Sequence, residues 1–115
     1  MRSALVVNDN QDLAQAIAAG LQSEGFQVRS ANNGLHGCAY YFREPTDLVV
    51  TDIQISELDG VEMMRCIRAV NPKVRAVYLN AAPTQAVLDR EQNEFAATVI
   101  EKPFSSAELL RQIGL

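Results

Sequence analysis

Hydrophobic residues in this chain gather in short runs that alternate with amphipathic segments. Five runs have the length and composition of β-strands, and they cover residues 4–8, 26–31, 47–52, 75–80 and 97–101. The second run, Phe26-Gln27-Val28-Arg29-Ser30-Ala31, alternates apolar and polar residues. It is therefore expected at an edge of a sheet, whereas the other four runs are expected to be well covered.

Each run is followed by a segment whose apolar residues recur at helical spacing. Asp9 or Asn10 is expected to cap the first helix, and Gly25 to end it. A fourth helix of weak amphipathicity is expected from Pro83 to about Glu94, and Ser105 and Glu108 form a capping box for the last. The expected buried faces of the first, second, third and last helices are, in this order, Leu13, Ile17 and Leu21; Leu35, Cys38, Ala39 and Phe42; Val61, Met64 and Ile67; and Leu109, Leu110 and Ile113.

The order strand–helix, repeated five times, predicts the fold. Right-handed crossovers turn this alternation into a parallel sheet with helices on both faces. We therefore expect an α/β, flavodoxin-like (βα)5 fold with strand order 2-1-3-4-5. The length of 115 residues fits one domain, spanning residues 1–115.

Composition narrows the classes of partner. The net charge is −4 and no basic cluster occurs, so direct binding to nucleic acid or to an anionic membrane surface is not expected. The apolar run at the N-terminus is too short for a signal peptide or a membrane span, which predicts a cytoplasmic location. Cys38 and Cys66 lack metal or redox spacing. They are expected to be small buried hydrophobic residues, without a disulfide or a redox role.

Polar side chains follow four of the expected strands at their carboxyl ends. In a parallel sheet these ends share one edge. The residues are Asn8, Asp9 and Asn10 after the first strand, Asp52 at the end of the third, Asn80 at the end of the fourth, and Lys102 after the fifth. Each has a plain structural explanation as a helix cap, a turn residue or a solvated lysine. Their arrival at one edge favours a functional site.

This set of groups suits phosphoryl capture on a carboxylate. Asp52 is the expected nucleophile, and it would form an acyl phosphate. Asp9 and Asp52 are expected to bind Mg²⁺, with the backbone carbonyl of Gln54 as a further ligand. Lys102 would neutralise charge on the phosphoryl oxygens, and the Asn80 amide would donate one more hydrogen bond.

The chain resembles a response-regulator receiver domain of two-component signalling. The resemblance covers essentially the whole chain, and it is carried by the segments Val6-Val7-Asn8-Asp9, Asp47 to Asp52, Leu58-Asp59-Gly60, and Glu101-Lys102-Pro103-Phe104. It implies Mg²⁺-dependent phosphoryl transfer from a histidine kinase or a histidine phosphotransfer protein onto Asp52, without turnover of an external substrate. It also implies a usually cis Lys102-Pro103 bond.

The resemblance further implies signalling through the face formed by the fourth helix, the fifth strand and the fifth helix. An output domain or a separate partner would bind there, and a homodimer stays open as an alternative. The sequence ends at Leu115, soon after the last expected helix begins, and both a stand-alone regulator and a piece of a longer protein stay open as alternatives.

Five positions depart from the family pattern: Ser56 stands where a Pro is usual and Phe95 where a Gly is usual, and the other three bear on the site and its switch. Asn8 stands where the family usually has an acidic residue, so Mg²⁺ is expected to bind more weakly. Asn80 replaces the usual Thr or Ser, and Val99 replaces the aromatic residue that couples to it. Two hypotheses therefore stay open. In the favoured one Asp52 is phosphorylated and the output is rewired; in the other the chain is an atypical receiver that binds proteins without phosphorylation.

Two other classes fit the sequence poorly. Phosphatases of the haloacid-dehalogenase type use a second aspartate two residues after the nucleophile, and here that position is Gln54. A flavin site would need phosphate-cradling donors in the first loop. The loop Asn8-Asp9-Asn10-Gln11-Asp12 offers no Gly, Ser or Thr, and its carboxylates would repel a phosphate.

Overall fold

The expected alternation of strands and helices is present in the computed structural model, which describes residues 2–53, 55, 57–80, 97–101 and 104–114. Within these residues five strands and four helices form. In chain order they are β1 (Ser3–Val7), α1 (Gln11–Ser23), β2 (Gln27–Ala31), α2 (Gly34–Arg43), β3 (Leu48–Asp52), α3 (Gly60–Val70), β4 (Arg75–Asn80), β5 (Ala97–Glu101) and α5 (Ser106–Ile113). The helix expected over residues 83–94 lies outside the described residues.

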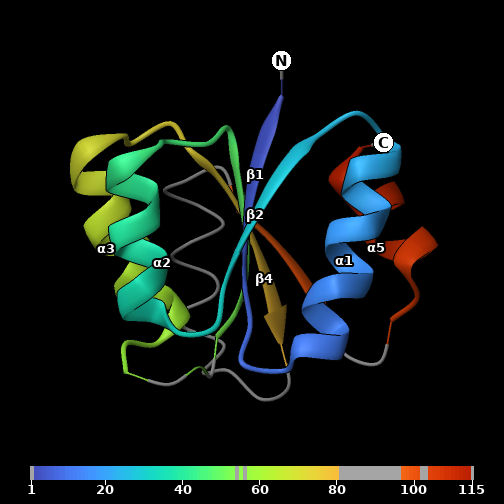
Figure 1. Ribbon diagram of the computed structural model, residues 1–115, viewed down its shortest axis with the longest axis horizontal. Coiled ribbons are helices and arrows are strands. Elements are labelled where there is room, and N and C mark those ends of the chain that lie inside the picture. Colours follow the sequence, from blue (N-terminus) through green and yellow to red (C-terminus); the bar gives the residue numbers. More distant parts are fainter. Residues whose placement is uncertain (1, 54, 56, 81–96, 102–103, 115) are drawn as a thin grey trace.

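The five strands form one parallel sheet in the order β2-β1-β3-β4-β5. This confirms the predicted order and the position of β2 at an edge. Helices α1 and α5 cover one face of the sheet, and α2 and α3 cover the other (Figure 1). None of the helices in the described part of the chain is long and apolar enough to cross a membrane.

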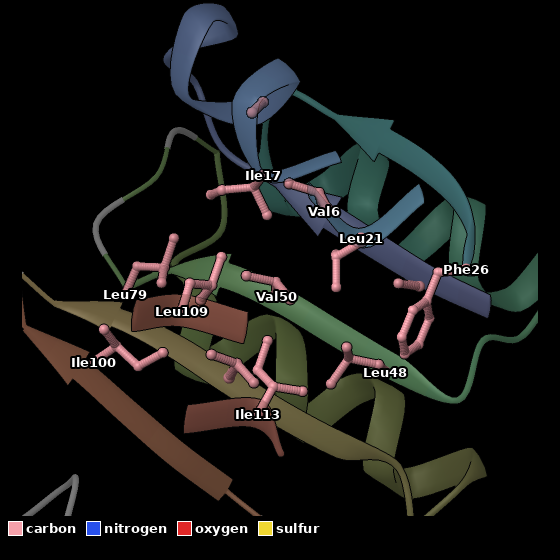
Figure 2. Close-up of a cluster of buried hydrophobic side chains, with 13 residues drawn as sticks. Val6, Ile17, Leu21, Phe26, Leu48, Val50, Leu79, Ile100, Leu109 and Ile113 are labelled. Carbon is pink, nitrogen blue, oxygen red and sulfur yellow. The ribbon is translucent and has the colours of Figure 1, made fainter. Parts of the chain in front are cut away.

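Alternation along the buried strands divides the core into two layers. Val6, Val50 and Leu79 contribute to the layer under α1 and α5, where Ile17 and Leu109 pack against them (Figure 2). The neighbouring residues Leu5, Val49 and Tyr78 point to the opposite layer, under α2 and α3. Successive side chains of a strand point to opposite faces. A continuous apolar run therefore supplies both layers at once, which explains why these strands are apolar throughout.

Helix starts follow the side-chain rules from which they were predicted. Asn10, Asn33, Asp59 and Ser105 are the N-caps of α1, α2, α3 and α5, and each side chain accepts a backbone N–H from the residue three positions later. The structure thus selects Asn10, rather than Asp9, as the cap of α1. Gly25, just beyond the end of α1, has a φ of 94°, a conformation that glycine adopts without strain.

The predicted buried face of α2 is wrong. Leu35 and Phe42 are 57% and 48% exposed, and Ala39 is also exposed. The buried residues of the helix are Gly34, Gly37, Cys38 and Tyr41, so that only Cys38 was placed correctly. The physical reason is the close approach of α2 to its neighbours. A Cβ on Gly37 would lie 2.5 Å from Met63 Sδ and 3.1 Å from Val7 Cγ2, so glycine at this position lets the helix approach these side chains closely.

The prediction for the two cysteines is half right. Cys38 is buried between α2 and α3, as expected, whereas Cys66 is exposed on α3. Hydrophobic spacing missed this because Cys66 lies beside the apolar stripe of α3 rather than on it. The buried residues of that helix include Val61, Met64 and Ile67, as predicted.

Tyr41 anchors α2 to the end of α3. Its side chain is fully buried, and its hydroxyl oxygen accepts a hydrogen bond from Asn71 Nδ2 at 2.9 Å. We expect Tyr41→Phe to lower the free energy of unfolding by about 1 kcal/mol, because the Asn71 amide loses its acceptor. Urea denaturation measures this change. Tyr40→Phe, on the half-buried neighbour, is the matched control, and equal losses in the two variants would contradict the anchoring role.

Candidate functional site

The carboxyl ends of the central strands lie side by side at one edge of the sheet. Strand register places Val7 beside Thr51 and Asp52 beside Leu79, while Asn80 pairs with Glu101. The loops that follow β1 and β3 therefore leave the sheet next to each other, at the lower edge in Figure 1. This confirms that the fold brings the ends of β1, β3, β4 and β5 together, as the topology predicted.

Asp52 is a buried carboxylate at the end of a strand that is buried along its whole length. Its side chain is 7% exposed. Leu48 and Val50 face the layer under α1 and α5, and Asp52 continues this row by strand alternation. Asp52 therefore lies where the hydrophobic core ends and the loops at the carboxyl ends of the strands begin.

Asn8 continues the matching row on β1, after Ala4 and Val6. Val6 pairs with Val50 across the two strands, so Asn8 comes to lie beside Asp52. Its side chain is fully buried. The departure from the family pattern at this position thus lies directly next to the proposed nucleophile.

The orientation of the Asn8 amide is fixed by its neighbour. Asn8 Oδ1 accepts the backbone N–H of Asn10 at 2.8 Å, an Asx turn that closes the start of the loop. Only the oxygen can accept this hydrogen bond, so Nδ2 must occupy the other position. Nδ2 is buried, and it has no hydrogen-bond partner within the part of the chain that the structure describes. A buried donor of this kind is suited to an acceptor that arrives with a ligand.

Asp9 lies at the exposed end of the same strand, one residue beyond Asn8. Because Asn10 provides the N-cap of α1, helix capping does not account for Asp9. Its exposed carboxylate and the nearly buried carboxylate of Asp52 follow adjacent strands. These are oxygen ligands of the kind that Mg²⁺ prefers.

The loop after Asp52 is held by two glycines that hydrophobic patterns do not reveal. Gly60 donates its N–H to the Ile53 carbonyl oxygen at 2.8 Å, which closes the loop at its base. A Cβ on Gly60 would lie 2.3 Å from the carbonyl oxygen of Asp52. On the other side, Gly34 packs against the Leu58 carbonyl oxygen, which a Cβ would approach to 1.8 Å. Both helices therefore start in contact with this loop.

A further feature of this loop is the backbone of Glu57, which has a φ of 72°. This left-handed conformation is uncommon for a residue other than glycine. It reverses the chain just before Asp59, whose side chain accepts the N–H of Glu62 at 2.9 Å and begins α3. The sequence gives one indication of the close contact at Gly60. Glycine is a poor helix former, and yet Gly60 occupies the first position of a helix.

The structure describes only part of the predicted site. Gln54, Lys102 and Pro103 lie outside the described residues, and so does the proposed geometry of the Lys102-Pro103 bond. Asn80 is the last residue of β4, and Lys102 follows the last residue of β5, Glu101. Val99 is half-buried on β5, where it pairs with Tyr78 and packs against the layer under α2 and α3.

The carboxylates at this edge of the sheet suit a hydrated divalent cation. Among the described residues, no group of three or more His, Cys, Asp or Glu side chains forms a metal cluster. The edge instead offers the two carboxylates of Asp9 and Asp52, beside the amide donor of Asn8. This set fits a cation that keeps much of its water shell, as Mg²⁺ does.

Comparison with known proteins agrees with the fold. The family model of the response regulator receiver domain matches residues 4–114. The response regulator receiver protein CpdR of Brucella abortus is 26% identical over 98% of this chain and 94% of its own length. The transcriptional regulatory protein GlrR of Escherichia coli is 31% identical over 95% of this chain but only 24% of its own length.

Solved structures give the same result. A CheY-like receiver domain protein from Methanospirillum hungatei superimposes with a TM-score of 0.88, at 22% identity, over 98% of this chain and 90% of that chain. The receiver domain of NtrX from Brucella abortus has a TM-score of 0.82 at 26% identity, over 94% of this chain and 92% of that chain. With a family model that spans nearly all of its residues and a fold shared with such domains, the chain belongs to the response regulator receiver domains of two-component signalling.

Proposed function

We propose that the chain accepts a phosphoryl group on Asp52 from a phosphohistidine donor. One observation carries this proposal: a nearly buried carboxylate ends the central strand, beside a buried amide whose donor is unsatisfied among the described residues. An Asp52 oxygen would attack phosphorus, so that a P–O bond forms while the P–N bond to the donor imidazole breaks. The leaving nitrogen then takes up a proton.

Charge is the main obstacle to this step, because a carboxylate must approach an anionic phosphoryl group. Lys102, which follows β5, would offset this charge with its ammonium group. Asn80, at the end of β4, would donate a hydrogen bond from its amide. Asn8 Nδ2 would donate to a phosphoryl oxygen or to an ordered water, since its own oxygen is held by Asn10.

Receiver domains generally use Mg²⁺ for phosphorylation. In this chain the proposed ligands are Asp9, Asp52 and the backbone carbonyl of Gln54, with Asn8 reaching the cation only through water. When bound, the cation offsets negative charge on the phosphoryl oxygens. The NH₂ end of the Asn8 amide cannot bind a cation directly, which supports a weaker Mg²⁺ site than one with a third carboxylate.

Receiver domains exchange phosphoryl groups with histidine kinases or histidine phosphotransfer proteins, and they act on output domains. We propose that this chain works as one receiver unit over residues 1–115 in the cytoplasm, with a donor of either kind. Its output would use β5 and α5 together with the helix expected over 83–94. There it would bind an output domain, a separate protein or a second copy of the chain.

Beryllofluoride, a phosphoryl mimic, tests the proposal. With Mg²⁺ it is expected to shift the amide NMR signals around Asp9, Asp52, Asn80 and Lys102, and Asp52→Ala is expected to abolish these shifts. Asp47→Ala is the matched control. It removes a carboxylate that lies just before the same strand, at the end opposite to Asp52. There Asp47 accepts the N–H of Ser3 at 3.0 Å.

Two outcomes would contradict phosphorylation at Asp52. One is the absence of any shift at millimolar Mg²⁺, and the other is an unchanged set of shifts in Asp52→Ala. Loss of the shifts in Asp47→Ala as well would show that they report folding rather than the site.

A further inference from the structure

The two cysteines of the chain lie on α2 and α3, which pack against each other. Cys38, on α2, is 7% exposed, and its Sγ lies 3.9 Å from the carbonyl oxygen of Met63 on α3. Cys66 lies one helical turn after Met63, on the same side of α3. Cys66 lies near enough to Cys38 to raise the pKa of the Cys38 thiol. The thiols are thus neighbours although they are far apart in the sequence.

The interface between α2 and α3 is closely packed on both sides of Cys38. Gly37, next to Cys38, lets α2 approach Met63 closely, as a Cβ there would lie 2.5 Å from Met63 Sδ. At the far end of the same interface, Tyr41 accepts a hydrogen bond from Asn71 at 2.9 Å. Contacts on both sides of Cys38 therefore hold the two helices in a fixed relation, which keeps the thiols together.

The two thiols differ in their access to solvent. Cys66 is exposed, so an oxidant in solution reaches it, whereas Cys38 is shielded. Burial, together with the neighbouring Cys66, raises the pKa of Cys38 to about 11. Cys38 therefore remains a protonated thiol at neutral pH, and the thiolate is the reactive form. The exposed Cys66 is consequently the group that reacts first.

We propose that Cys38 and Cys66 form a modification site, which hydrogen peroxide oxidises to a disulfide that links α2 to α3. Cys66 sulfur attacks one peroxide oxygen, the O–O bond breaks, and Cys66 becomes a sulfenic acid as one water is released. Cys38 sulfur then attacks the Cys66 sulfur, the S–O bond breaks, and a second water leaves. Both thiols are oxidised and one peroxide is reduced to two waters. Oxidation of the two cysteines does not require phosphorylation of Asp52.

The link would join the helices that border the loop after Asp52. Gly34 at the start of α2 packs against Leu58, and Gly60 at the start of α3 packs against Asp52. A disulfide between α2 and α3 would therefore restrict the relative movement of the two helices that border this loop. None of the proposed site residues takes part in the disulfide.

Treatment of the reduced full chain with hydrogen peroxide tests the proposal. Mass spectrometry is expected to show a loss of about 2 Da, one disulfide within the monomer, and recovery of both thiols with a reductant. In Cys38→Ser, Cys66 is expected to proceed to a sulfinic acid or to link two chains. In Cys66→Ser, which changes an exposed position, Cys38 is expected to stay a free thiol.

The opposite pattern would overturn the proposal. A wild-type chain that gains oxygen on Cys66 while Cys38 stays free to react with a maleimide after unfolding would show that the pair does not close. A disulfide found only between two chains would do the same. Circular dichroism of the treated protein separates a link formed in the folded state from one formed after unfolding, and the latter would also contradict the proposal.

Discussion

Gly60→Ala is expected to destabilise the chain by about 3 kcal/mol, the upper end of the effect of overpacking a rigid site. The reason is the contact between the start of α3 and the strand that ends in Asp52. A Cβ at this position would lie 2.3 Å from the carbonyl oxygen of Asp52 and 3.2 Å from its carbonyl carbon. These are backbone atoms of a buried strand, so they cannot move aside as a flexible side chain would.

The same substitution is expected to weaken the response to beryllofluoride, because the displaced backbone is that of the proposed nucleophile. Urea denaturation measures the stability, and the amide signals around Asp52 report the site. Gly20→Ala is the matched control. Its Cβ would meet Leu110 Cδ1 at an ordinary 3.7 Å, and alanine is a better helix former than glycine, so this variant should be slightly more stable. Equal stability of the two variants would contradict the close contact at Gly60.

The fold was predictable because several independent patterns agree. The apolar runs that became β1, β3 and β4 supply both layers of the core, so they had to be covered on both faces. The alternating run at β2 could only be an edge strand, and it is one. Once the order of the strands was fixed, the edge that carries Asp9 and Asp52 followed from the topology alone.

What the sequence did not reveal depends on distances between backbones. Hydrophobicity favoured Leu35 and Phe42 as the core face of α2, yet the helix turns Gly34 and Gly37 inward, at the two positions where a neighbouring segment comes closest to it. No periodic pattern marks a glycine that is buried for this reason. In the same way, the nearness of Cys66 to Cys38 depends on how α2 packs against α3, which only the structure shows.

At the proposed site, too, the sequence predicted one part of the arrangement and the structure supplies another. The sequence identified Asn8 as a departure from the family, and it suggested a weaker Mg²⁺ site on charge alone. The structure adds the orientation of the amide: Oδ1 is held by the N–H of Asn10, and Nδ2 is the group that remains at the site. The position therefore carries a hydrogen-bond donor where the family usually carries a negative charge.

Asn8→Asp is expected to tighten Mg²⁺ binding about tenfold, which corresponds to about 1.4 kcal/mol. The substitution is nearly isosteric, and an aspartate oxygen can still accept the N–H of Asn10, so the turn is preserved. It replaces a fully buried amide donor with a carboxylate beside Asp52. Without Mg²⁺ the added like charge should destabilise the fold, since two neighbouring carboxylates disfavour each other's ionised forms.

Thermal denaturation with and without Mg²⁺ checks both effects. The Asn8→Asp variant should melt below the wild type without the cation, and it should gain more from its addition, because a ligand stabilises the folded state more when it binds more tightly. Asn10→Asp is the matched control: it makes the same chemical change two residues away, at an exposed N-cap that aspartate also serves. If Asn10→Asp strengthened Mg²⁺ binding as much as Asn8→Asp, the general charge of this edge would account for the effect. A gain confined to Asn8→Asp would instead mean that the Asn8 amide itself limits the affinity of this receiver domain for its cation.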